Sequence, residues 1–270
     1  MAQQIKFFRK NIIDLENTIN MTVTDSVALN NGQDFLSFVR NRKNTSAWMT
    51  TGSTNAANTQ IDIDFRSPYE IDTIMILLHN LRSYTVQYFN GSIYVNFSTP
   101  ISVTNGTADN SIFTFTSVIT NKIRIIITDV NGSTDDKKIT QIIITKSLGQ
   151  LAGWPVISKP TVSRNKKINK MISGKAQVVD TIETVRFDLN VEILSLDADL
   201  TLLENLYDKI EGFLVWINAG DEAQFSSVRK LYRFEDIYLM RPIDDWTPEF
   251  YRGVYTAGMK ISVSLQEAVY

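Results

Sequence analysis

The chain has 270 residues and a net charge of −2 at pH 7, and 43% of its residues are hydrophobic. It is long enough for one large or two medium domains with real cores, and its charge gives no global attraction to nucleic acid or anionic membranes. It contains no cysteine and a single histidine, His79, which excludes disulfides, thiolate metal sites, cysteine nucleophiles and histidine-rich metal sites within one chain.

The apolar runs indicate neither a membrane span nor a secretory signal. The longest strongly apolar run, residues 74–78, is far shorter than the ~20 residues that span a bilayer. The opening MAQQIKFFRKNIIDLEN contains no apolar segment of signal-peptide length. We therefore interpret the six N-x-[ST] sequences as a result of an Asn- and Thr-rich composition; they begin at Asn20, Asn44, Asn90, Asn96, Asn105 and Asn131.

Residues 20–146 show short strands separated by turns. Asn-Gly pairs, which tolerate the positive φ angles of tight hairpins, separate many of them. The segment YTVQYF alternates strictly, which is typical of a half-buried strand, whereas IMILL and IRIII are continuous apolar runs, typical of strands covered on both sides. This pattern predicts an antiparallel β-sandwich with strands at 60–65, 73–78, 84–89, 92–97, 111–115, 122–128 and 139–145.

The composition changes near residues 146–160, where KSLGQLAGWPVISKP contains two glycines and two prolines. We therefore expect two domains, 1–147 and 148–270. In the second, DADLTLLENLYDKIEG predicts a helix at about 199–211, with Asp197 or Asp199 as its cap and Gly212 after its end. Strand patterns lie on both sides of it, so the fold class is mainly β: a sandwich followed by a smaller β domain packed on one α-helix.

A basic stretch follows the linker. SRNKKINKMISGK, together with Lys159, contains six basic residues, and no acidic residue occurs until Asp180. It is either a solvated β-hairpin arm or a contact with an acidic partner or with nucleic acid. It has no interleaved aromatic residues, so stacking on single strands is not supported. The candidate contact residues are Arg164, Lys166, Lys167 and Lys170.

His79 is the obvious candidate for catalysis. It follows a buried run and precedes NLRS, where a strand leaves the sheet, and no G-x-S-x-G sequence accompanies it. We expect His79 and Asn80 to brace this strand connection through hydrogen bonds. Asp62 and Asp64 share one face of a strand, either as a glycosidase pair or as ordinary outward alternation.

The remaining polar residues match no known chemical motif. Asp244, Asp245 and Glu249 surround a tryptophan in a loop that binds a cation or sugar, or else forms a surface or subunit contact. No EF-hand, dinucleotide-binding or P-loop sequence occurs. We expect no catalytic residue, metal or cofactor. Trp48 either stacks on a sugar or closes one end of the sandwich, and with Asn44 and Arg82 it is a candidate carbohydrate or partner contact.

Residues 1–147 resemble the galactose-binding-like (discoidin, F5/8 type C) jelly-roll family. The resemblance rests on NTSAWMTTG, IDIDF, IDTIMILLHNL with YTVQYFNG, and KIRIIIT with KKITQIIIT. The His-Asn-Leu ending of one strand is similar to the version found in bacteriophage tail proteins. The second half resembles the small domains of tail-tube and distal-tail proteins, through the order of its elements.

The resemblance implies a virion structural protein, made in the bacterial host cytoplasm and located in the phage tail at the distal tail or baseplate. Such a protein would form a homo-oligomeric ring and dock tail-tube, tail-tip or fibre proteins, without sequence-specific nucleic-acid binding. The alternative is a carbohydrate-binding module that contacts host-surface glycans. A third hypothesis is a glycosidase built on the aspartates described above.

Overall fold

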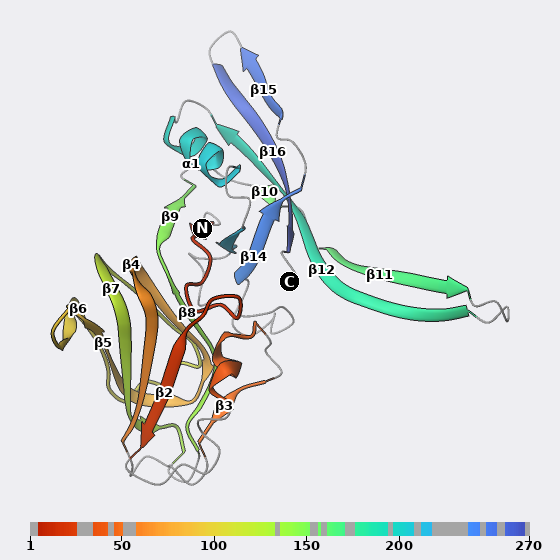
Figure 1. Cartoon of the computed structure of the whole chain (residues 1–270). Coiled ribbons are helices and arrows are strands. Elements are labelled where there is room, and N and C mark those ends of the chain that lie inside the picture. The colour runs from red at the N-terminus through yellow and green to blue at the C-terminus, as the bar shows by residue number, and fades with distance from the viewer. Residues whose placement is uncertain are drawn as a thin grey trace. The chain divides into compact units, whose positions relative to one another are not determined.

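The computed structural model describes residues 5–25, 35–42, 46–50, 58–132, 136–151, 156–157, 161–170, 176–193, 197–207, 212–217, 237–243, 247–252 and 257–267. Strands dominate these ranges, and α1 (Asp197–Tyr207) is their one α-helix, which confirms the expected mainly-β class (Figure 1). The chain forms two compact units. The described residues of the first run from Arg9 to Ser147, and those of the second are 5–8 and 148–267.

The first unit is an antiparallel β-sandwich. Its strands pair in the order β3-β8-β4-β7-β5-β6, with β2 beside β4. A short 3₁₀ helix, η1, accompanies them. These elements are β2 (Asn20–Asp25), η1 (Leu36–Arg40), β3 (Trp48–Met49), β4 (Thr59–His79), β5 (Leu81–Phe89), β6 (Tyr94–Val103), β7 (Ser111–Val130) and β8 (Lys138–Thr145).

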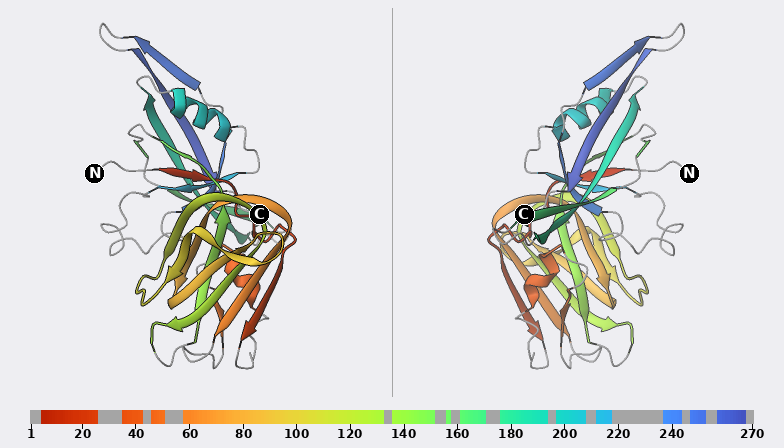
Figure 2. Two further views of the ribbon diagram at one scale, coloured as in Figure 1. Left: turned by 90° about the vertical axis from the view of Figure 1, so that its left-hand side faces the viewer. Right: turned by 90° about the vertical axis from the view of Figure 1, so that its right-hand side faces the viewer.

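Two long strands, β4 and β7, each take part in both layers of the sandwich. Residues 59–64 of β4 pair with β2 and with the second half of β7, whereas residues 73–79 pair with β8. The register between β4 and β7 shifts between Asp64 and Tyr69, where Arg66 has a φ of 67°. Each strand therefore bends from one layer into the other, which Figure 2 shows from two sides. The sequence predicted two separate strands in each case, because the polar residues at each bend interrupt the apolar pattern.

The core of the sandwich is formed by the inward residues of both layers. Ile61 and Ile63 of β4 meet Ile123 and Ile125 of β7, and all four are fully buried. The run 71–77 is buried almost throughout, as expected for a strand covered on both faces. Such burial of branched aliphatic side chains is the main stabilising contribution to this unit.

The second unit is a nine-stranded antiparallel sheet. Its strands follow the order β10-β12-β16-β14-β13-β1-β9, with β11 beside β12 and β15 beside β16. They are β1 (Lys6–Phe8), β9 (Ser147–Gln150), β10 (Val156–Ile157), β11 (Thr161–Lys170), β12 (Ala176–Ile193), β13 (Phe213–Trp216), β14 (Ile237–Pro242), β15 (Thr247–Arg252) and β16 (Ala257–Glu267).

The position of strand β1 differs from the expected division into domains. Residues 1–147 were expected to form one domain, but Phe7 pairs with Val215 of β13, and the Phe7 and Phe213 rings meet edge to face at 5.9 Å. The first described residues therefore belong to the second unit. The apolar segment IKFF fits any buried strand, so the sequence does not reveal which sheet it joins.

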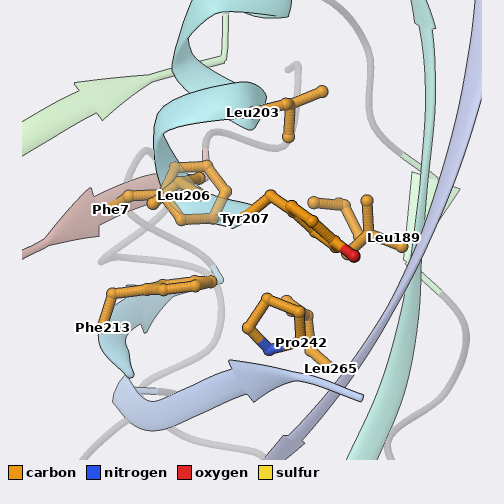
Figure 3. Close-up of a pocket in the computed structure, with 9 residues that line it drawn as sticks. Phe7, Leu189, Leu203, Leu206, Tyr207, Phe213, Pro242 and Leu265 are labelled. Atoms are coloured by element: carbon orange, nitrogen blue, oxygen red, sulfur yellow. The ribbon is translucent and has the colours of Figure 1, made fainter. Parts of the chain in front are cut away.

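Helix α1 covers one face of this sheet. Leu203 and Leu206 of the helix line a small apolar pocket together with Phe7 and Phe213, which Figure 3 shows. Its volume of about 10 Å³ leaves space for no more than about one water molecule, so it is a packing joint and not a ligand site. Gly149 of β9 has a φ of 144°, and a Cβ there would lie 3.1 Å from Leu202, which accounts for the glycine.

Strands β11 and β12 form a long ribbon that extends away from the rest of the sheet (Figure 1). Residues 176–185 of β12 pair with β11 along this length, whereas its residues 186–193 pair with β16. The predicted basic contact residues lie on this ribbon, and the backbones of Arg164 and Lys166 face those of Glu183 and Asp180. Their side chains lie outside the described part of the structure.

Candidate functional site

His79 lies at the end of β4 and is 4% exposed. Its Nδ1 atom accepts a hydrogen bond from the backbone N–H of Leu81, at 3.1 Å. Its Nε2 atom lies 2.9 Å from the hydroxyl oxygen of Ser111. The ring also meets Tyr84 edge to face, with 5.7 Å between centroids. The imidazole is therefore fixed on three sides within the sandwich.

These bonds decide what the imidazole can do chemically. Because Nδ1 accepts a hydrogen bond from the N–H of Leu81, it carries no proton in the neutral ring, so the ring proton lies on Nε2, which then donates to Ser111. A serine nucleophile requires the opposite tautomer, in which Nε2 accepts the hydroxyl proton and Nδ1 donates to a carboxylate. Burial lowers the pKa of His79 to about 4, opposed by the charge of Asp109. The geometry thus fits a neutral bracing side chain and not a general base.

Asn80 continues the bracing on the adjacent loop. Its Nδ2 donates to the carbonyl oxygen of Asp136 at 2.7 Å, and its Oδ1 accepts from the backbone N–H of Lys138 at 2.8 Å. Its own carbonyl oxygen accepts from the N–H of Asn131, at 2.8 Å. Asn80 therefore links the β4–β5 turn to the residues at both ends of the β7–β8 loop.

Arg82 stands beside this braced connection, and 45% of its side chain is exposed. Its Nε lies 3.6 Å from Oδ2 of Asp129, whose side chain is 23% exposed. The other carboxylate oxygen of Asp129, Oδ1, accepts from the N–H of Val130. The loop after β6 closes against the same place, because the N–H of Gly106 donates to the carbonyl of Arg82 and that of Asn105 to the Ser83 hydroxyl. The result is a partly exposed guanidinium–carboxylate pair on a rigid base, which we call the Arg82 patch.

The other predicted contacts of the sandwich differ from expectation. Trp48 is 0% exposed and its backbone pairs with Ile139, so its ring closes the core and cannot stack on a ligand. Of the two alternatives for Trp48, the buried position fits the ring that closes one end of the sandwich and does not fit stacking on a sugar. The sequence left both open, because the pattern around an aromatic residue does not show which way it points. Asn44 lies outside the described residues. Asp129 was missed, since only the pairing of β5 with β7 brings it to Arg82.

Asp62 and Asp64 lie on the outer face of β4, and each forms an ion pair. Asp62 receives the guanidinium of Arg124, with Nε at 2.7 Å from Oδ1, and this guanidinium also covers the ring of Tyr94 at 3.7 Å. Asp64 lies 3.0 Å from the ammonium of Lys122. Slight burial raises the pKa of Asp64, but bonds from the Arg66 backbone and Lys122 outweigh it and lower the pKa overall. A glycosidase acid needs a raised pKa, so Asp64 does not suit that role.

The remaining candidate residues, Asp244, Asp245 and Glu249, belong to the second unit. Asp244 and Asp245 lie outside the described residues, and the backbone of Glu249 in β15 pairs with that of Lys260. Across the described ranges, no group of three or more acidic or histidine side chains is arranged to hold a metal ion. No helix in the same ranges has the length and apolar content needed to cross a bilayer.

No protein-family model and no curated protein matches this sequence. Several solved structures are similar to about half of it. Chitosan-binding module 1 of a Paenibacillus sp. IK-5 chitosanase/glucanase is 20% identical, covering 50% of this chain and 98% of its own, with a TM-score of 0.39. The Clostridium perfringens module CpGH89CBM32-5, solved with GalNAc-β-1,3-galactose, is 13% identical over 46% of this chain and 94% of its own, with a TM-score of 0.36.

A second C. perfringens module, CpGH89CBM32-6, is 15% identical over 51% of this chain and 99% of its own, with a TM-score of 0.38. The sandwich fold itself rests on the strand pairing described above, independently of these likenesses.

Proposed function

We propose that this chain is a non-catalytic binding protein whose sandwich recognises a carbohydrate at the Arg82 patch. The observation that carries the proposal is the partly exposed Arg82–Asp129 pair beside the β4–β5 connection of the sandwich. A guanidinium supplies a planar set of donors and a carboxylate supplies acceptors, so together they match the alternating donors and acceptors of neighbouring sugar hydroxyls.

Preorganisation supports the same proposal. His79, Asn80, Asn105 and Gly106 hold the three segments around the patch through hydrogen bonds to fixed partners. A ligand that binds here does not have to order these loops first, and the loss of affinity through ordering is correspondingly small. The Arg82–Asp129 pair is also loose enough, at 3.6 Å, to exchange its contact for one with a ligand.

Replacing Arg82 with alanine is expected to weaken glycan binding by about ten- to a hundredfold, since a lost hydrogen bond to a charged group costs about 1.5–3 kcal/mol. Screening of the full chain on immobilised glycans, followed by titration of the best ligand, measures this. Arg124→Ala is the matched control, because Arg124 is also an ion-paired arginine of the sandwich but lies on the outer face of β7. Equal losses in both variants, or a wild-type chain that binds no glycan, would sink the proposal.

A second candidate function is favoured by the β11–β12 ribbon. An isolated two-stranded ribbon is marginally stable in water, so a long one gains stability by docking on another protein. This supports the expectation of a phage-tail structural protein that assembles as a homo-oligomer and docks neighbouring tail proteins in the virion. The basic residues of β11 would then form part of the docking surface.

Mass photometry of the purified chain tests this assembly. We expect particles several times the mass of one chain, and we expect monomers after removal of the paired ribbon residues 164–170 and 176–183. Glycan binding by the shortened chain should be unchanged, which separates the two candidates. A wild-type chain that stays monomeric at every concentration would contradict the assembly function.

A further inference from the structure

Four Asn-Gly pairs occur in the chain, at Asn31, Asn90, Asn105 and Asn131. In such a pair the backbone nitrogen of the glycine can attack Cγ of the asparagine side chain. A C–N bond forms, the side-chain amide leaves as ammonia, and a cyclic succinimide results. Water then opens the ring at either carbonyl and gives aspartate or isoaspartate. Glycine favours the attack because it has no side chain to hinder it. Asn31 lies outside the described residues.

Asn105 is protected by its surroundings. The backbone N–H of Gly106, the nucleophile of this pair, donates a 2.8 Å hydrogen bond to the carbonyl of Arg82. The nitrogen must lose this proton and this partner before it can attack. A Cβ on Gly106 would also lie 2.7 Å from Val103, so the glycine is packed closely and has little room to move.

Asn90 is restrained in a different way. Its side-chain Oδ1 accepts two hydrogen bonds at 3.0 Å, from the backbone N–H groups of Ser92 and Ile93. Its own N–H donates to the carbonyl of Ile93. The reacting carbonyl is thus held in one orientation by the turn between β5 and β6, and attack requires that turn to open.

Asn131 lacks both kinds of protection. Its N–H donates to the carbonyl of Asn80, which fixes its backbone. Within the described part of the chain, its side-chain amide makes no hydrogen bond and neither does the N–H of Gly132. We propose that Asn131–Gly132 is the first of the three described Asn-Gly pairs to deamidate in the folded chain, ahead of Asn90 and Asn105.

Aspartate and isoaspartate would both change the start of the β7–β8 loop, where Asn131 bonds to Asn80. Each adds a negative charge two residues after Asp129, close in sequence to the partner of Arg82. Isoaspartate also carries the main chain through the former side chain, and this extra methylene lengthens the backbone next to the bond from Asn131 to Asn80. The site does not depend on whether the sandwich binds a sugar.

Peptide mapping by mass spectrometry tests the proposal on the full chain, incubated at mildly alkaline pH and sampled over time. In the folded protein we expect deamidation at Asn131 to be at least about fivefold faster than at Asn105, because one hydrogen bond of Gly106 must break first. In concentrated urea the rates at Asn90, Asn105 and Asn131 should converge, since all three pairs have the same Asn-Gly chemistry.

Asn131→Gln is the matched variant. It should abolish the fast appearance of deamidated product in the peptide that contains position 131 and leave the rates at Asn90 and Asn105 unchanged. The proposal is overturned if Asn105 reacts as fast as Asn131 in the folded protein. It is also overturned if the same ratio of rates persists in urea, because the fold would then not control the reaction.

Discussion

Replacing His79 with glutamine is expected to flatten the pH dependence of the stability of the sandwich in mildly acidic solution. Burial lowers the pKa of His79 from 6.5 in the unfolded chain to about 4 in the folded one. Between these values the unfolded state binds the proton and the folded state does not, so the free energy of unfolding falls as the pH falls from 6.5 toward 4. The full loss is on the order of 3 kcal/mol.

Urea unfolding at a series of pH values measures this effect for both chains. Glutamine cannot take up the proton, so the wild type should lose stability relative to His79→Gln only below pH 6.5. The contributions of the carboxylates are common to both chains and cancel in the difference. Parallel curves for the two chains would show that His79 is not held neutral, and would reopen the question of a reactive histidine.

Replacing Trp48 with alanine is expected to destabilise the sandwich by about 3–5 kcal/mol, because a fully buried tryptophan leaves a cavity. Met49 provides the control in the next position of the same strand. It is 47% exposed, so Met49→Ala should change stability by no more than about 0.5 kcal/mol. Hydrogen exchange at the amides of β8, which β3 pairs with, reports on this unit alone.

The same variant separates a core role from a ligand role for Trp48. If the ring only fills the core, glycan binding by Trp48→Ala should decrease in proportion to the fraction unfolded. A Trp48→Ala chain that is as stable as the wild type and yet no longer binds sugar would contradict the buried position of the ring.

Local patterns were sufficient for some elements of the fold. The alternation in YTVQYF predicted β5, because a half-buried antiparallel strand imposes a period of two on its side chains. The spacing of Leu203 and Leu206 predicted α1, whose apolar stripe packs on the sheet. The double burial of residues 74–77 followed from the continuous apolar run to which they belong.

Features that depend on residues distant in sequence could not be predicted. The bends of β4 and β7 place polar residues inside a single strand, which the sequence pattern interprets as two strands. The pairing of β1 with β13 and the approach of Asp129 to Arg82 are contacts across the fold, and no local signal encodes them. The bracing of the β4–β5 connection was foreseen only in outline, since the tautomer of His79 depends on Leu81 and Ser111.

Strand β1 has a consequence for the order in which the chain folds. It is synthesised before the sandwich, but its partner β13 is synthesised only after the whole sandwich. The sandwich starts and ends at neighbouring points, since the N–H of Arg9 donates to the carbonyl of Lys146, so it can fold as a complete insertion while β1 waits. Folding of the sandwich then brings residues 9 and 146 together. This shortens the effective length of chain between β1 and the rest of the second unit, which lowers the entropy cost of pairing β1 with β13.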